Sequence, residues 1–185
     1  IRSQVLLPYY KGWGAGTVNP ALYNSFMPGD TRKSASIISI DDEGLSNAYV
    51  VGDQAQYTGL FFKKFTPLNN GKPEDQGGNF QWDNYDNYPV IRFADVLLMG
   101  AELQLSTNAG KAQQYYDRVR DRAFQDEVHR IPLTSKKQLL DERRYELALE
   151  GQRYWDLLRQ GIPAAKQAID NSSANPAFNV SFRPE

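Results

Sequence analysis

The sequence predicts a mainly α-helical fold in which a helical hairpin and C-terminal helices follow a loop-rich segment that carries a few short strands. Two observations support this division. Residues 1–90 are rich in glycine, proline, asparagine and aromatic residues, whereas residues 91–169 repeat apolar residues three and four positions apart. The length of 185 residues suits one domain, or a large piece of a bigger one.

The loop-rich segment contains three predicted elements between its turns. The runs Ala35–Ile40 and Tyr57–Phe65 have the composition of short strands. A short helix is expected over Pro20–Phe26, because Asn19 can cap it and proline suits the first helical position. The stretch Asn69–Tyr88 has turn signals without apolar periodicity and predicts a long surface loop.

Two predicted helices form an antiparallel hairpin because the break between them is short. The first covers about Ile91–Leu105 and is apolar nearly all round, so we expect it to be buried. The second covers about Lys111–Phe124 and has one apolar face. That face consists of Ala112, Tyr115, Tyr116, Val119 and Ala123. Helices joined in this way form a tetratricopeptide-like unit.

A third predicted helix begins near Ser135, where Gln138 completes a capping box. At about 100° per residue, one apolar face continues to Leu158 across a kink at Gly151. We expect this face to pack in the core; it comprises Leu140, Leu147, Ala148, Tyr154, Trp155 and Leu158.

Charged residues on the third helix predict a lattice of ion pairs. Arg144 lies on the apolar face, and a buried guanidinium must be paired. Glu142, Glu146 and Glu150 form a like-charged stripe that Arg143 and Arg153 can offset. We interpret the arrangement as structural.

Composition excludes several classes of function. The net charge of −1 gives no general attraction to phosphate backbones, so nucleic acid is a poor partner. The absence of cysteine excludes disulfides, thiolate metal sites and thiol nucleophiles within these residues. His129 is the single histidine, and no cofactor or metal site is predicted.

The segment Glu142 to Arg159, ERRYELALEGQRYWDLLR, closely resembles the C-terminal signature of the SusD/RagB family. Two upstream phrases strengthen the resemblance, YPVIRFADVLLM at residues 88–99 and VRDRA at residues 119–123. The run Tyr57–Phe65 and the early Gly29-Asp30-x-Arg32 also look like the family's.

This resemblance implies a bacterial outer-membrane lipoprotein on the cell exterior that binds nutrients and is not an enzyme. The ligand would be an oligosaccharide or a peptide, and the partner a SusC-like TonB-dependent transporter. Family members are much longer, so residues 1–185 would be a C-terminal part. The N-terminal portion, with the lipid anchor, would lie upstream.

Aromatic residues in the loops are the candidate ligand contacts, because flat rings stack on the apolar faces of sugars. Tyr10 and Trp13 belong to one loop, and Trp82, Tyr85 and Tyr88 belong to the predicted loop 69–88. Many loop aromatics instead cover the edges of a core. The acidic runs at residues 41–44 and 83–86 lack the spacing of a calcium loop and are interpreted as solvated turns.

Two other functions fit parts of the sequence. One is a tetratricopeptide-type adaptor that binds a partner protein, although such adaptors stack several units and only one hairpin is clear here. The other is a glycoside hydrolase with two carboxylates in a groove. Arginines interleave the helical carboxylates and would keep their pKa values low, which does not suit a general acid.

Overall fold

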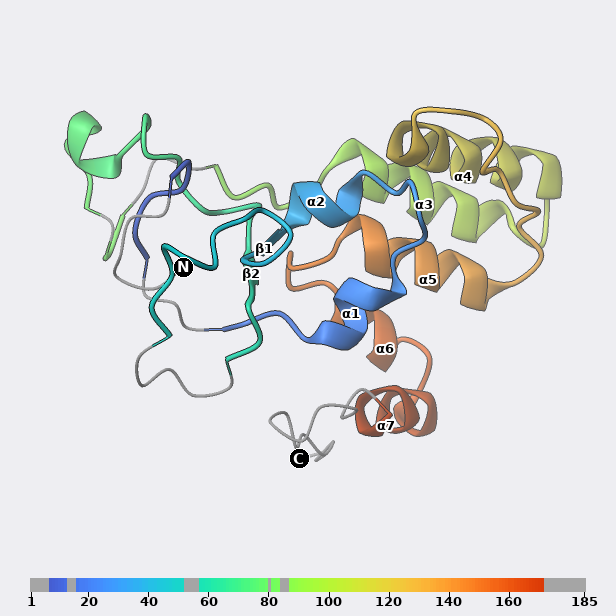
Figure 1. Cartoon of the computed structure of the whole chain (residues 1–185). Helices are drawn as coiled ribbons and strands as arrows, with labels where there is room; N and C mark the ends of the chain where they lie inside the picture. Colours follow the sequence, from blue (N-terminus) through green and yellow to red (C-terminus); the bar gives the residue numbers. More distant parts are fainter. Residues whose placement is uncertain (1–6, 13–15, 52–56, 80, 84–86, 172–185) are drawn as a thin grey trace. The chain divides into compact units, whose positions relative to one another are not determined.

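The computed structural model describes residues 7–12, 16–51, 57–79, 81–83 and 87–171 (Figure 1). These residues form seven α-helices, one short 3-10 helix and one two-stranded sheet, so the predicted mainly α-helical class is confirmed. In chain order the elements are α1 Pro20–Ser25, α2 Arg32–Ser36, β1 Ile37–Ser39, β2 Leu60–Phe62, η1 Pro73–Gln76, α3 Phe93–Gln104, α4 Ala109–Phe124, α5 Lys136–Glu146, α6 Arg153–Leu158 and α7 Ile162–Asp170. Among the described helices, none has the length and apolar character that spanning a membrane requires.

The chain divides into two compact units. Of the described residues, unit 1 contains those within 7–25 and 34–83 together with 87 and 88, and unit 2 contains 26–33 and 89–171. The short segment Phe26–Lys33 thus belongs with the helices that follow it much later in the sequence. The boundary after this segment falls inside α2.

Unit 1 is built around the two predicted strands, which are shorter than the apolar runs that contain them. β1 and β2 pair in antiparallel register, with Ile38 opposite Phe61. Both side chains are buried in a cluster with Tyr9 and Tyr49. The predicted cap of α1 is confirmed, because the Asn19 side-chain oxygen accepts a hydrogen bond from the backbone N–H of Ala21 at 2.8 Å.

Unit 2 contains the predicted hairpin of α3 and α4. The apolar face of α4 packs on α3, and the small residues Ala101 and Ala112 are fully buried where the helices meet. Asn108 caps α4 by accepting from the backbone N–H of Lys111 at 3.0 Å. A Cβ atom at Gly100 would lie 3.1 Å from the ring of Tyr115, so glycine permits this close approach.

The expectation that α3 is buried all round is wrong. One stripe, which includes Leu97, Leu98 and Ala101, is buried. The opposite side leaves Val96 and Leu103 exposed by 45% and 76%. Unit 2 covers only one face of α3, and periodicity alone cannot show how many neighbours a helix has.

The expectation of one long helix from Ser135 to Leu158 is also wrong. Ser135 and Gln138 do form the predicted capping box, but α5 ends at Glu146 and α6 begins at Arg153. Between them Leu149 and Gly151 adopt positive φ angles of 68° and 75°, which a right-handed helix cannot accommodate.

This break redirects the aromatic residues of the last predicted face. Leu140, Leu147 and Ala148 are buried as expected. Tyr154 and Trp155 are 49% and 62% exposed and contact each other edge to face at 5.4 Å, so their predicted core role is wrong. The loop between α5 and α6 changes the direction of the chain. A projection that assumes one continuous helix therefore does not give the face on which the α6 residues lie.

A pair of glycine substitutions tests the loop between α5 and α6. Gly151→Ala places a Cβ atom on a backbone with φ of 75° and should lower the free energy of unfolding by about 1–2 kcal/mol. Gly110→Ala lies in the first turn of α4, with its nearest neighbour 3.8 Å away, and should raise it by about 0.5–1 kcal/mol. Chemical denaturation measures both, and effects of the same sign would contradict the described backbone.

Candidate functional site

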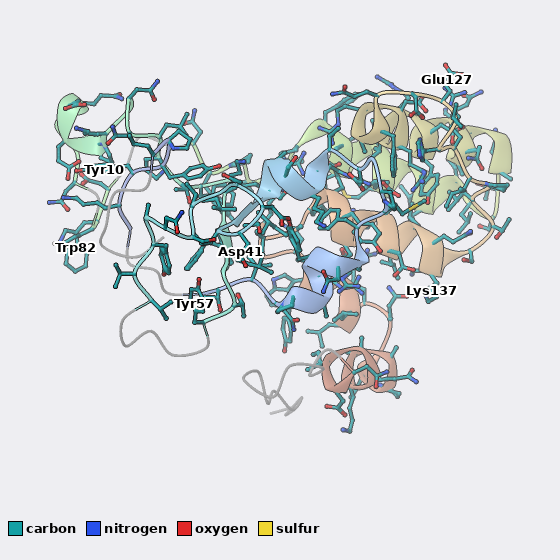
Figure 2. The ribbon with its side chains drawn as sticks, viewed as in Figure 1. Tyr10, Asp41, Tyr57, Trp82, Glu127 and Lys137 are labelled. Atoms are coloured by element: carbon teal, nitrogen blue, oxygen red, sulfur yellow. The ribbon has the colours of Figure 1, made fainter. Side chains whose placement is uncertain are left out.

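The predicted loop 69–88 presents Trp82 on a tight turn. The backbone N–H of Asp83 donates to the carbonyl of Asn79 at 2.9 Å, and the N–H of Asn79 donates back to the carbonyl of Asp83 at 2.8 Å. The Asn79 side-chain oxygen also accepts from the N–H of Gln81 at 2.8 Å. Hydrogen bonds therefore join Asn79 to Gln81 and Asp83, while the Trp82 side chain is 81% exposed and projects from unit 1 in Figure 2.

Tyr88 is the second exposed aromatic residue of this loop. Its side chain is 60% exposed, and its ring lies 5.2 Å from the ring of Phe65, which follows β2. An aromatic neighbour at this distance restricts the ring and leaves the rest of its surface accessible. Trp82 and Tyr88 thus both offer apolar surface to solvent.

Tyr10 lies in a different environment from the exposed pair. It is 8% exposed, and its backbone N–H donates to the carbonyl of Pro67 at 2.8 Å. The ammonium groups of Lys11 and Lys72 lie 5.3 and 5.7 Å from the centre of its ring. The ring therefore packs beneath the start of the loop. Trp13 and Tyr85, the other two predicted contacts, lie outside the described residues.

The acidic turn at residues 41–44 uses its carboxylates within the protein. Asp41 accepts from the hydroxyl of Ser46 at 2.7 Å, and Glu43 pairs with the ammonium group of Lys63 at 3.0 Å. Tyr23 donates to Asp42. Among the described residues, no group of three or more acidic, histidine or cysteine side chains has the arrangement of a metal site.

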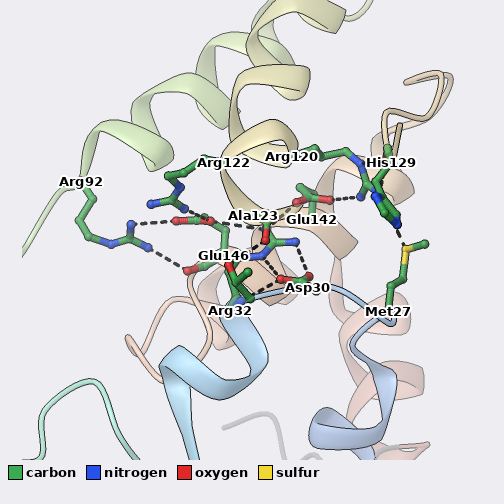
Figure 3. A network of polar contacts seen from close by, with 11 residues as sticks. Met27, Asp30, Arg32, Arg92, Arg120, Arg122, Ala123, His129, Glu142 and Glu146 are labelled. Carbon is green, nitrogen blue, oxygen red and sulfur yellow. Dashed lines mark hydrogen bonds and ion pairs between the residues drawn. The ribbon is translucent and has the colours of Figure 1, made fainter. Parts of the chain in front are cut away.

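Unit 2 contains the predicted ion-pair lattice, which is confirmed, although its members differ from the predicted ones (Figure 3). Glu142 is 2% exposed and accepts from Arg32 at 2.6 Å and from Arg120 at 2.7 Å. Arg32 also binds Asp30 through two hydrogen bonds of 2.7 and 2.8 Å. The segment Phe26–Lys33 is thereby attached to α5.

Glu146, one turn further along α5, is the second centre of the lattice. It accepts from Arg92 at 2.8 Å and from Arg122, and it lies 3.4 Å from Arg32. Arg92 continues to Glu150, which it binds through two hydrogen bonds of 2.8 Å. The three like-charged carboxylates are thus each paired with arginines from other segments.

The arginines set the protonation of this lattice. Burial alone would raise the pKa of Glu146, but hydrogen bonds and charge from Arg122 and Arg92 outweigh it and lower the pKa below its usual value. Burial likewise acts to lower the pKa of Arg92, and its bonds to Glu150 and Glu146 raise it instead. Glu146 stays ionised, which suits a structural ion pair better than a proton donor.

The buried arginine of the signature is Arg143, not the predicted Arg144. Arg143 is 5% exposed and binds Asp95 at 2.6 Å and Asp156 at 2.9 Å, whereas Arg144 is only half-buried. The buried face of α5 therefore includes Leu140 as predicted, but it extends to Arg143 and not to Arg144. Sequence reasoning also missed Arg32 and Arg92 as partners, because both lie more than fifty residues before the glutamates that they bind.

A family model described as the SusD family matches residues 40–181. The chain belongs to the SusD family. The match covers β2 of unit 1 and all the described helices of unit 2 from α3 onward, including the glutamates of the lattice.

Individual SusD-like proteins agree with this family. "SusD-like protein P2" of Formosa agariphila is 27% identical over 170 residues, which are 86% of this chain and 34% of that protein. Among solved structures, surface glycan-binding protein A from Bacteroides thetaiotaomicron has a TM-score of 0.80 at 27% identity, covering 96% of this chain and 38% of that one. The same protein in complex with laminarihexaose has a TM-score of 0.73 at 25% identity, covering 96% and 38%. The chain thus spans about a third of the length of these SusD-like proteins.

Glu146→Gln tests the lattice. At neutral pH it should lower the free energy of unfolding by about 1–3 kcal/mol, because it removes a buried charge that accepts from Arg92 and Arg122, although Arg92 keeps Glu150 as a partner. Glu127→Gln is the matched control. Glu127 is exposed and bound only to Arg130 in a surface pair, so this change should cost about 1 kcal/mol or less.

The effect of Glu146→Gln should depend on pH in a defined direction. Because the folded pKa of Glu146 lies below the ordinary value of 4.5, the unfolded state takes up a proton first and the stabilisation is lost as the pH falls through the folded value. Denaturation at several pH values should show that the difference in free energy of unfolding between the protein and the variant narrows as the pH falls below 4.5. A difference that stays constant from neutral to acid pH would contradict the lowered pKa.

Proposed function

We propose that the chain takes part in capturing glycans at the cell surface, with the loop 69–88 as a contact surface. The observation that carries the proposal is the 81% exposed Trp82 on a backbone that is tied by its own hydrogen bonds. A structural neighbour with a TM-score of 0.73 is a surface glycan-binding protein in complex with laminarihexaose, which supports a glucan-type ligand.

The chemistry of sugar binding fits these side chains. A pyranose ring has apolar C–H faces that pack on flat aromatic rings, and its hydroxyls need hydrogen-bonding groups around that contact. Trp82 and Tyr88 supply exposed rings, and Asp83 and Asn87 supply polar groups close to them in sequence. In this proposal Trp13 and Tyr85 add further rings, and Tyr10 supports the loop from beneath.

The proposed role is binding without turnover. A glycoside hydrolase needs one carboxyl group with a raised pKa as general acid. Glu146 has a lowered pKa, and Glu142 and Glu146 are both fully occupied by arginines in the interior of unit 2. These carboxylates are not available to a sugar.

Membership of the family supports a wider setting for this binding. We infer that the whole polypeptide is anchored at the outer membrane through a lipid upstream of residue 1. It would deliver oligosaccharides, or peptides, to a SusC-like TonB-dependent transporter. The chain covers about a third of its SusD-like relatives, so this setting concerns the whole protein.

Titration calorimetry with laminarihexaose and a panel of other oligosaccharides and peptides tests the proposed contact. Trp82→Ala should weaken binding of the preferred ligand about tenfold or more, because the stacked surface is lost. Trp155→Ala is the matched control, since Trp155 is 62% exposed but belongs to unit 2. Equal affinity of Trp82→Ala and the unchanged protein would refute the contact, and a preference for peptides over every glycan would refute the ligand class.

A further inference from the structure

A groove of about 260 Å³ lies on unit 2 where the start of α3 meets the second half of α4. Three arginines line it, Arg92, Arg118 and Arg122, together with apolar residues that include Phe93, Leu97 and Val119. The volume is just below the roughly 300–1,000 Å³ of pockets that enclose a whole ligand. It suits a single residue of a larger molecule.

The charges of this groove do not cancel. Arg92 and Arg122 pair with the buried carboxylates behind them, and the lattice of Arg32, Arg92, Arg120 and Arg122 with Asp30, Glu142, Glu146 and Glu150 contains four charges of each sign. Arg118 is additional. Within the described residues it forms no ion pair, and its guanidinium lies 5.2 Å from the centre of the Phe93 ring.

The acidic neighbours of Arg118 on α4 are engaged elsewhere. Asp117 accepts a hydrogen bond from Gln113 at 2.7 Å. Asp121 binds Arg130 at 2.6 Å. The groove therefore carries a net positive charge next to an exposed aromatic ring, and the side chain of Arg122 adds a second guanidinium that is 57% exposed.

We propose that this groove binds a carboxylate-bearing sugar residue of an acidic glycan. A planar guanidinium matches a carboxylate with two parallel hydrogen bonds, and Arg118 and Arg122 lie one helical turn apart on the same side of α4. The 63% exposed ring of Phe93 offers apolar surface to the C–H groups of the same residue.

This inference rests on the proposed glycan binding and adds a second contact of different chemistry. The loop 69–88 offers exposed tryptophan and tyrosine rings, which suit a neutral sugar. The groove on unit 2 combines an unpaired guanidinium with a phenylalanine, which suits a charged one. An acidic peptide side chain would satisfy the arginines but lacks the rigid C–H face that packs on Phe93.

The test follows the backbone amide NMR signals of residues 92–97 and 118–122 while the chain is titrated with tri-galacturonic acid. The fully methyl-esterified trisaccharide is the matched ligand control, because it keeps the rings and removes the charge. We expect shifts in these signals with the acid and not with the ester. Shifts of the same size with both ligands, or with neither, would overturn the proposal.

Arg118→Gln should weaken binding of tri-galacturonic acid about tenfold, since one charge-assisted contact is lost. Arg118 is exposed, so the fold should be retained. Lys137→Gln removes the same charge from the exposed start of α5 and should leave the affinity unchanged. Equal weakening by both substitutions would show only general charge attraction and would overturn the site, as would tighter binding of tri-glutamate than of the trisaccharide.

These experiments test the two proposed contacts independently, because each substitution should affect the binding of one ligand only. Arg118→Gln should not change the binding of laminarihexaose, and Trp82→Ala should not change the shifts that tri-galacturonic acid causes in residues 118–122. Loss of both ligands on Trp82→Ala alone would place the acidic sugar at the loop and refute the groove.

Discussion

The structure of unit 2 depends on the ion pairs between the carboxylates of α5 and arginines from distant segments. Glu142 and Glu146 are each about 2% exposed, and their partners come from residues 26–33, from the start of α3 and from α4. A buried and unpaired charge at either position would cost several kcal/mol. Any packing of these segments that separates the glutamates from their arginines is therefore unfavourable. We interpret the lattice as selecting how these segments pack against one another more than as raising the free energy of unfolding, since buried ion pairs contribute little net stability.

The same lattice occupies the carboxylates of the C-terminal signature in this SusD-family chain. The glutamates of the signature form ion pairs with arginines inside unit 2, and these arginines keep Glu146 ionised. Trp82 and Arg118 are exposed and lie outside this lattice, and in our two proposals these side chains contact the ligands. A rigid helical core and variable exposed residues can in this way serve different ligands without changing the fold.

Local signals predicted the helices well, because caps and periodicity act over a few residues. Asn19 and the capping box of Ser135 mark predicted helix starts that the structure confirms. Contacts between residues far apart in the sequence, and changes of chain direction, could not be predicted from these local signals. The pairing of Arg32 with Glu142 spans 110 residues, and the positive φ at Leu149 redirects the chain so that Trp155 leaves the predicted face.

For the loop aromatics, the sequence identified the exposed Trp82 and Tyr88 but could not separate them from the buried Tyr10, since burial depends on which segments pack over a ring.

A double-mutant cycle between Arg32 and Glu142 tests the central role of the lattice most directly. The free energy of unfolding is measured for Arg32→Met, Glu142→Met, the double variant and the unchanged protein. If the buried pair holds residues 26–33 to α5, the two single changes should be non-additive by about 1–3 kcal/mol, with the double variant less destabilised than the sum. Additivity within about 0.5 kcal/mol would contradict the account, because the two side chains would then contribute independently.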